Sequence, residues 1–361
     1  DTSARVWKHG RSCHIGACPG HDATGSQVHI MSDLRLTFAI GDYLHMRELA
    51  LGRVKAEGID LTVLTLPLET IAYRFLAAYE WEVSEFSLAT YCAMVANGNA
   101  PMVGLPVFPS RVFRHGSIFV RDNSPIRSAA DLKGKKIGIP QWTQTAVTYV
   151  RGWMQHDAGV PLTSIDWIQA GVNDAGRKEM TTFELPPGYR LTSAPDKNLG
   201  AMLVNGDIDA MISARPPTVF LDRKHGIKRL IPDHRAQEEA YFRKTGIFPI
   251  MHLVVLRRDA YEANRWIARN LVEAFEKAKR ACLPELYQGQ TSFLPTAWGN
   301  DHAEETNRLL FPADDPWPYG IEKNRKTLEP FLAFCHEQGV TKRKLAVEEL
   351  FPKEVSVELK I

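Results

Sequence analysis

The sequence predicts an α/β fold in which parallel strands alternate with helices. Residues 131–140, Asp-Leu-Lys-Gly-Lys-Lys-Ile-Gly-Ile-Pro, have the pattern of a Lys-Gly turn followed by a short apolar strand. Residues 203–212, Leu-Val-Asn-Gly-Asp-Ile-Asp-Ala-Met-Ile, have the pattern of a helix end, a glycine turn and another buried strand. A strand, a polar helix start, a helix and a further strand are the components of an α/β unit with parallel strands.

Length and composition set the scale. The chain has 361 residues, enough for two lobes of ordinary size, and its 44% hydrophobic and 24% charged residues are typical of a globular protein. The formal net charge of +2 and the lack of a dense basic run give no reason to expect a nucleic acid or an anionic membrane as a partner. No stretch approaches the roughly 20 apolar residues of a membrane span.

The two motifs resemble the second lobe of type II periplasmic-binding-protein folds. The resemblance implies two α/β lobes with a ligand cleft between them. We expect residues 31–118 and 253–361 to form the first lobe and residues 119–252 the second.

The first lobe begins with residues 34–40, whose alternating, β-rich pattern predicts a strand. A turn at residues 41–43 follows, and then a helical pattern over residues 44–56 that ends at Gly58. Further strands are predicted over residues 59–66, 82–84 and 101–108, and helices over residues 69–78 and 88–96.

Residues 117–121 are predicted to be the strand on which the chain crosses to the second lobe, and residues 253–256 the strand on which it returns. In the second lobe we expect strands over residues 137–139, 166–169 and 208–212 and helices over residues 147–155 and 196–205. Helices over residues 260–283, 303–310 and 320–338 are expected to pack back on the first lobe.

Residues 1–30 differ from the rest, because they are rich in Gly, Ser and His and lack an apolar periodic face. We expect Met31 to be the native start and residues 1–30 to be a non-native leader, not a secretory signal. Five potential metal ligands of this leader match standard zinc spacings poorly. They are His9, Cys13, His14, Cys18 and His21.

The other cysteines, Cys92, Cys282 and Cys335, lie in apolar helical contexts. Their odd number argues against a disulfide framework, so we expect a reducing cytoplasm.

Polar residues at strand ends and helix starts are the first candidates for a ligand site, because such positions face the crevice of an open α/β fold. Gln141, Thr143, Gln144 and Thr145 follow the strand over residues 137–139. Backbone N–H groups and hydroxyls there could hold a carboxylate. The alternative is plain capping of the next helix.

Cationic residues form the second group. Arg111, Arg114 and His115 precede the crossing strand, and Ser213 and Arg215 follow the strand over residues 208–212. Arginine binds carboxylates bidentately, which lysine does not. The alternative is a solvated loop with ion pairs to nearby acids.

Glu85 and Ser87 follow the short strand over residues 82–84. Glu85 is either a base or ligand anchor or a cap of the next helix. His252 lies beside the return strand and is either a structural hydrogen-bonding residue or a group that moves protons near neutral pH.

Several catalytic signatures are missing from the sequence, among them the phosphate-binding Gly-x4-Gly-Lys-Ser/Thr loop, Gly-x-Gly-x-x-Gly, His-Glu-x-x-His and Gly-x-Ser-x-Gly. We therefore expect no cofactor. A divalent metal has no supporting motif but is left open, because its ligands could come from distant segments.

Three blocks carry a closer likeness: residues 82–87, residues 109–115 and residues 315–328, which include Pro-Trp-Pro-Tyr-Gly and Asn324. Together they resemble the 4,5-dihydroxyphthalate decarboxylase family, and the likeness extends from about Leu34 to the C-terminus. The resemblance implies release of CO2 from a dihydroxylated aromatic diacid without an organic cofactor.

For this chemistry we expect Arg111, Arg114 or Arg215 to clamp a carboxylate with help from the threonines. His115 or His252 would donate a proton to the ring, and Glu85 would engage a ring hydroxyl. The tryptophans either stack on the substrate or fill the core; they are Trp81, Trp142, Trp298 and Trp317. The competing function is a solute receptor or sensor for an aromatic carboxylate. Formation of a homo-oligomer is left open.

Overall fold

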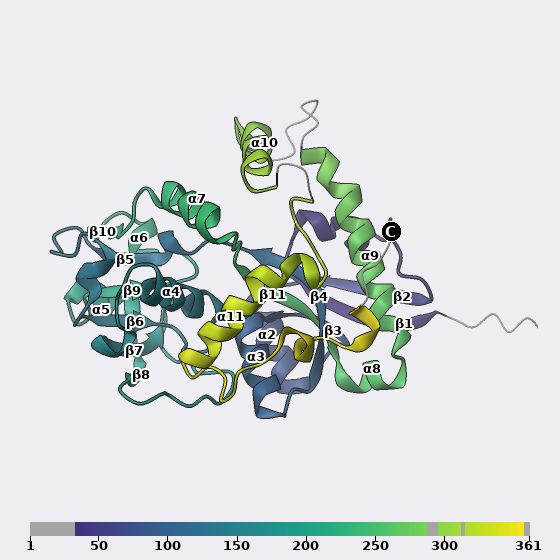
Figure 1. Ribbon diagram of the computed structural model, residues 1–361, viewed down its shortest axis with the longest axis horizontal. Helices are drawn as coiled ribbons and strands as arrows, with labels where there is room; N and C mark the ends of the chain where they lie inside the picture. Colours follow the sequence, from purple (N-terminus) through teal and green to yellow (C-terminus); the bar gives the residue numbers. More distant parts are fainter. Residues whose placement is uncertain (1–32, 287–294, 312–314, 357–361) are drawn as a thin grey trace, which may run out of the picture. The chain divides into compact units, whose positions relative to one another are not determined.

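The computed structural model describes residues 33–286, 295–311 and 315–356 and shows a mixed α/β architecture with two β-sheets (Figure 1). This confirms the predicted fold class. The predicted leader, with Met31 and the five potential ligands from His9 to His21, lies outside the described residues.

The first sheet has the strand order β2-β1-β3-β11-β4. Its strands are β1 (Leu34–Ile40), β2 (Ile59–Thr65), β3 (Val83–Ser87), β4 (Met102–Arg111) and β11 (Ile250–Arg257). Strand β1 runs parallel to β2 and β3, whereas β11 lies antiparallel between β3 and β4. The carboxyl ends of β1, β2 and β3 therefore share one edge of the sheet.

The second sheet has the order β10-β5-β9-β6-β7-β8. Its strands are β5 (Ile118–Arg121), β6 (Lys136–Ile139), β7 (Asp166–Gly171), β8 (Arg190–Asn198), β9 (Ala210–Ile212) and β10 (Ile227–Arg229). Strands β6, β7, β8 and β9 are parallel, and β5 is antiparallel to both β9 and β10. The ends of β6, β7 and β9 meet at one edge, together with the start of β5.

Helices connect and cover these sheets. The α-helices are α1 (Arg47–Ala50), α2 (Leu68–Ala78), α3 (Leu88–Asn97), α4 (Thr145–His156), α5 (Leu199–Asn205), α6 (Thr218–Leu221), α7 (His234–Thr245), α8 (Arg258–Ala263), α9 (Trp266–Cys282), α10 (Gly299–Leu310) and α11 (Arg325–Glu337). The 3-10 helices are η1 (Leu44–Met46), η2 (His115–Ser117), η3 (Ala129–Leu132), η4 (Leu162–Ser164), η5 (Leu283–Leu286), η6 (Glu322–Asn324), η7 (Val347–Leu350) and η8 (Lys353–Val355). No helix in the described part of the chain is both long and apolar enough to cross a membrane.

The two opening motifs form the predicted structures. Gly134 precedes β6 with a φ of 75°, and Gly206 ends α5 with a φ of 85°. Both values lie in the left-handed region, where glycine has no Cβ to clash.

The C-terminal helices differ in what they cover. Helix α9 packs against α1 and β4, as predicted, and Phe275 in α9 meets the ring of Phe38 edge-on with centroids 5.2 Å apart. Helix α11 packs against both α3 and α4, so it also touches the part of the chain that builds the second sheet (Figure 1). Cys92, Cys282 and Cys335 are buried and have free thiols.

Several predicted boundaries are wrong. The helix predicted over residues 44–56 ends at Ala50, because a turn with Gly52 at a φ of 68° follows it. The helix predicted over residues 196–205 begins at Leu199, since the preceding residues form β8 and the side chain of Asn198 caps the helix by accepting from Ala201 N–H. The helix predicted over residues 260–283 is divided into α8 and α9.

Strands β8 and β10 and helices α6 and α7 were not predicted. Strand β8 is mostly exposed and polar, and α7 has one buried residue, Tyr241. A segment with so little apolar surface lacks the periodicity from which secondary structure is predicted.

Candidate active site

The facing edges of the two sheets are joined by a hydroxyl pair. The Oγ of Ser87, at the end of β3, lies 2.9 Å from the Oγ1 of Thr145 at the start of α4. Thr145 also accepts a hydrogen bond of 3.0 Å from the backbone N–H of Ala89. Two residues predicted from separate motifs therefore meet, in a contact that satisfies both hydroxyls.

A buried carboxylate organises the edge of the first sheet. Glu85 is fully buried, and its Oε1 accepts from the hydroxyl of Tyr43 and pairs with Nδ1 of His252, each at 2.6 Å. Its Oε2 accepts from the backbone N–H of Gly41 at 2.9 Å. Glu85 therefore does not cap the following helix; it joins β1, β3 and β11 through one carboxylate.

Hydrogen bonding decides the ionisation state of this cluster. Burial opposes ionisation of Glu85, but the hydrogen bonds and charge of His252 and the donors of Tyr43 and Gly41 outweigh it and lower the carboxyl pKa. Burial and the neighbouring Glu85 raise the pKa of Tyr43 far above its usual range. Tyr43 is thus a protonated donor to an ionised carboxylate.

The backbone around the cluster is irregular. The register between β11 and β4 shifts on both sides of His252. Such bulges turn a side chain away from the regular ladder and are common beside active sites. Gly41 allows the close approach of its backbone, because a Cβ there would lie 3.2 Å from Oε2 of Glu85 and 3.0 Å from Cε2 of Tyr43.

Two of the predicted arginines act on this cluster. The charge of Arg215 opposes the rise of the Tyr43 pKa, and Arg114 likewise lies within electrostatic range of Tyr43. Burial lowers the pKa of Arg114 to about 10, so Arg114 stays cationic at neutral pH. Arg215 is 66% exposed and forms an ion pair of 3.1 Å with Glu69, which lies in the first turn of α2.

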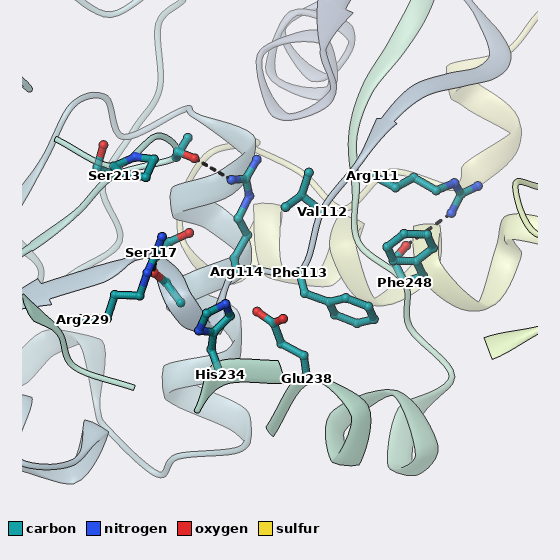
Figure 2. A pocket seen from close by; sticks show the side chains of 13 residues that line it. Arg111, Val112, Phe113, Arg114, Ser117, Ser213, Arg229, His234, Glu238 and Phe248 are labelled. Carbon is teal, nitrogen blue, oxygen red and sulfur yellow. Dashed lines mark hydrogen bonds between the residues drawn. The ribbon is translucent and has the colours of Figure 1, made fainter. Parts of the chain in front are cut away.

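Arg114 also borders a cavity of about 370 Å³ (Figure 2). Its Nη1 donates a hydrogen bond of 2.8 Å to the carbonyl of Ala214, and its Nε contacts the sulfur of Met251 at 3.1 Å. The cavity lining includes three of the predicted residues, Arg111, Arg114 and Ser213, and it does not include Glu85 or His252. Ser213 itself is buried and donates to the carbonyl of Arg215.

Arg111 has a different environment from the other two arginines. Its guanidinium donates to the carbonyls of Phe248 and Pro318 and to the side chain of Asn324. Figure 2 shows it turned away from Arg114. These bonds favour a structural role, in which Arg111 fastens the Pro-Trp-Pro-Tyr-Gly segment to the end of β4. The three arginines expected to share one crevice do not converge on one point.

His115 is buried, with its ring edge-on to Trp153 and Tyr241. Neither ring nitrogen has a hydrogen-bond partner among the described residues. Its Nδ1 lies 3.8 Å from Glu238, too far for a hydrogen bond. Burial lowers the pKa of His115 to about 4, so the ring is neutral at pH 7 and poorly suited to donating a proton.

Acid unfolding gives a test of this environment. An unfolded histidine titrates near 6.5, so between about 6.5 and 4 the unfolded chain binds more protons than the folded chain. The contribution of His115 to stability is therefore complete above about pH 6.5 and is lost as the pH falls toward 4. His115→Leu is expected to remove about 3 kcal/mol of this acid-induced loss, measured by urea unfolding across this range. His45, whose pKa burial also lowers to about 4, remains in both proteins; an equal loss in both would contradict the prediction.

The predicted carboxylate cradle at the start of α4 holds a carboxylate of the chain itself. Glu179 accepts from the Thr143 hydroxyl at 2.6 Å, from the Thr143 N–H at 3.3 Å and from the N–H of Trp142. Gln141 supports the same loop, because its side-chain amide donates a hydrogen bond of 2.6 Å to the carbonyl of Lys178 and accepts one from Arg177. In this conformation the donors are occupied.

Gln144 precedes α4 as its N-cap residue but makes no side-chain cap hydrogen bond. Its buried Oε1 has no partner among the described residues. It is a polar group at the predicted position with a free acceptor.

Removing Glu179 should therefore loosen this loop. In Glu179→Ala the buried donors of Trp142 and Thr143 lose their acceptor, which is expected to cost about 1–3 kcal/mol of unfolding free energy. Urea unfolding and limited proteolysis measure the effect. Glu184→Ala changes an exposed carboxylate of the same loop and serves as the control; equal behaviour of the two variants would contradict the prediction.

The tryptophans have separate environments. Trp81 and Trp142 are fully buried, and Trp142 carries the guanidinium of Arg151 at 3.6 Å from its ring centroid. Both are core residues. Trp298 is 67% exposed, and the half-buried Trp317 packs against Phe248, with ring centroids 5.6 Å apart.

Outside the undescribed segments, no group of three or more His, Cys, Asp or Glu side chains is arranged to hold a metal ion.

Sequence reasoning missed Tyr43, Glu69 and Glu179. Tyr43 and Glu69 follow the ends of β1 and β2, so the rule that selected Ser87 and Ser213 would also have found them. Glu179 lies in a long loop and has no local pattern that marks it.

Comparison with known proteins places the chain in a family. No protein-family model matches it. It is 35% identical over 323 residues to the 4,5-dihydroxyphthalate decarboxylase of Comamonas testosteroni, covering 89% of this chain and 97% of that protein. It is 35% identical over 215 residues to the 4,5-dihydroxyphthalate decarboxylase of Pseudomonas putida, covering 59% of this chain and 83% of that protein.

Among solved structures, the periplasmic aliphatic sulphonate binding protein SsuA from Escherichia coli matches with a TM-score of 0.51 at 14% identity, covering 90% of this chain and 99% of that chain. This likeness confirms the predicted periplasmic-binding-protein-like fold. The identity over nearly the full length of both sequences shows that the chain belongs to the 4,5-dihydroxyphthalate decarboxylase family.

Proposed function

We propose that this protein is a carboxy-lyase that converts 4,5-dihydroxyphthalate to protocatechuate and CO2. Beyond family membership, the observation that carries the proposal is the hydrogen-bonded cluster of Tyr43, Glu85 and His252. An imidazole paired with an ionised carboxylate can donate and accept protons near neutral pH. The positive charges of Arg114 and Arg215 beside this cluster support binding of a dianionic substrate.

The reaction needs a proton on the ring carbon that carries the departing carboxylate. The ring hydroxyl para to that carbon first gives its proton to water, which raises the electron density at the carbon. The protonated imidazole of His252 then transfers a proton to the carbon, the bond to the carboxylate breaks, and its electron pair returns to the ring as CO2 leaves. The phenolate and His252 each take a proton from water, so each turnover consumes one proton and replaces one carboxylate with one hydrogen.

Glu85 serves this step indirectly. Both of its oxygens are engaged by Gly41, Tyr43 and His252, so they are unavailable to a ring hydroxyl. We infer that Glu85 is a positioning residue. Because it is ionised, it accepts from Nδ1–H of His252 and leaves Nε2 for the substrate.

The substrate carboxylates are assigned to Arg114 and Arg215. Arg114 keeps Nη2 without a hydrogen-bond partner in the described part of the chain. Arg215 is exposed and paired with Glu69, a contact that a substrate carboxylate can replace. Two guanidinium groups match the two carboxylates of a phthalate in charge and in planar geometry.

One incubation tests the activity. The protein is mixed with 4,5-dihydroxyphthalate, and CO2 and protocatechuate are measured with and without a chelator. Equal formation of both products supports the proposal, and loss of activity with the chelator would add a metal ion to it. Tight binding without CO2 release would instead favour the receptor function.

Location and assembly are further proposals. We infer a cytoplasmic location, supported by the buried free thiols of Cys92, Cys282 and Cys335. Cell fractionation and light scattering measure the location and the oligomeric state.

The predicted lobe boundaries at residues 118 and 253 also remain a proposal. The distribution of strands between the two sheets supports them, although β11 already begins at Ile250.

A further inference from the structure

A second polar space lies beside the proposed reaction centre, at the edge of the second sheet where β5 begins and β9 and β10 end. Ser117 precedes β5, Ser213 follows β9 and Arg229 ends β10, and all three line the cavity of about 370 Å³. Helix α7 contributes His234 and Glu238 to the same lining (Figure 2). None of these five side chains takes part in the cluster around His252.

The cavity presents cationic donors. Arg229 donates to the carbonyl of Gly116, and its guanidinium lies 5.1 Å from the ring centroid of Phe119 and 5.2 Å from that of Phe220. These rings hold the guanidinium in place while its remaining N–H groups have no partner among the described residues. Arg114 lines the same space, and its Nη2 has no hydrogen-bond partner among the described residues. Two guanidinium groups can donate charge-assisted hydrogen bonds to one carboxylate.

The cavity also has an acidic group and an apolar wall. Burial raises the pKa of Glu238, while His234 and backbone N–H groups act in the opposite direction. A carboxyl group of this kind can exchange hydrogen bonds with a hydroxyl. On the apolar side, Phe113 and Phe248 stack with centroids 5.0 Å apart. A flat ring fits such a wall.

We propose that this cavity binds a hydroxylated aromatic monocarboxylate, with the carboxylate on Arg114 and Arg229 and a hydroxyl on Glu238. That this ligand class includes the reaction product rests on the proposed function. Because Arg114 serves both the cavity and the substrate, product held in the cavity slows the next turnover.

Direct binding tests this proposal without relying on activity. Benzoate and 3,4-dihydroxybenzoate are titrated calorimetrically into the full-length protein and into variants. Arg229→Met is expected to weaken binding of both by about 10-fold or more, because it removes a charge-assisted contact. Lys228→Met removes the neighbouring charge of the same strand, whose Nζ donates to the carbonyl of Asp122, and is expected to change affinity less than about 2-fold.

Two further variants separate the alternatives. Glu238→Ala should weaken the binding of 3,4-dihydroxybenzoate about 3- to 10-fold and leave the affinity for benzoate unchanged, since benzoate has no hydroxyl. His252→Ala should leave both affinities unchanged. Arg229→Lys keeps the positive charge but loses the bidentate guanidinium geometry. Its affinity for both ligands should lie between those of the wild type and Arg229→Met. A graded loss of this kind distinguishes a lost contact from a folding defect.

Wild-type affinity in Arg229→Met, or equal loss in His252→Ala and Arg229→Met, would overturn the proposal, because the ligand would then bind elsewhere. If the protein released no CO2 but Arg229→Met still lost benzoate, the proposed function would fail and the cavity site would stand.

Discussion

His252→Ala is expected to lower kcat by about 10²- to 10⁴-fold, because one well-placed acid or base group contributes this much. His252 is 15% exposed, so it can reach both the substrate and the buried Glu85. Steady-state formation of protocatechuate measures the loss. The variant also takes one partner from the buried Glu85 carboxylate, so its free energy of unfolding is expected to fall and turnover is compared at a temperature where urea unfolding shows it to be folded.

His115→Leu is the matched control, because the sequence alone offered His115 and His252 as equal candidates. His115 is packed between aromatic rings without a hydrogen-bond partner in the described regions. Its variant should turn over within a few-fold of wild type. If His115→Leu lost as much turnover as His252→Ala, or if His252→Ala kept near-normal turnover while folded, the assignment of the proton donor would be wrong.

Glu85→Gln is expected to lower kcat by about 10²-fold and to reduce stability by about 3 kcal/mol or more. An amide cannot carry the negative charge that holds Nδ1–H of His252, so the imidazole loses its orientation and its electrostatic support. Breaking a buried charged pair typically costs about 3–5 kcal/mol. Turnover, its pH profile and urea unfolding are the measurements.

A positioning role predicts more than lost activity. The pH profile of kcat should shift, because the charge that acts on His252 is gone, and Glu85→Asp should recover part of the rate. Glu80→Gln changes an exposed carboxylate paired with Arg74 and should change neither rate nor profile. An unshifted profile in Glu85→Gln, with stability alone reduced, would show that Glu85 is only structural.

The family resemblance was carried partly by residues that hold the fold. In the block with Pro-Trp-Pro-Tyr-Gly, the indole N–H of Trp317 donates to the carbonyl of Phe108, and Asn324 and Pro318 accept from Arg111. These contacts fasten a C-terminal segment to β4. Such a block identifies a family well without containing its chemistry.

The sequence by itself determined the α/β class, most strands, the glycine turns at Gly134 and Gly206 and the candidate positions at strand ends. These follow from local periodicity and backbone conformation, which act over a few residues. The exposed β8 and α7 were not predicted, because they bury too little apolar surface to produce a periodic hydrophobic pattern.

Only the tertiary structure decided which candidates act together. Tyr43, Glu85 and His252 come from three strands or their ends, and a carboxylate ionises in the interior only where donors from all of them converge. The same packing buries His115 and engages Arg111 in hydrogen bonds that hold the structure together. Partners in space, rather than neighbours in sequence, set whether a polar side chain is reactive, because desolvation and hydrogen bonding depend on the whole surrounding structure.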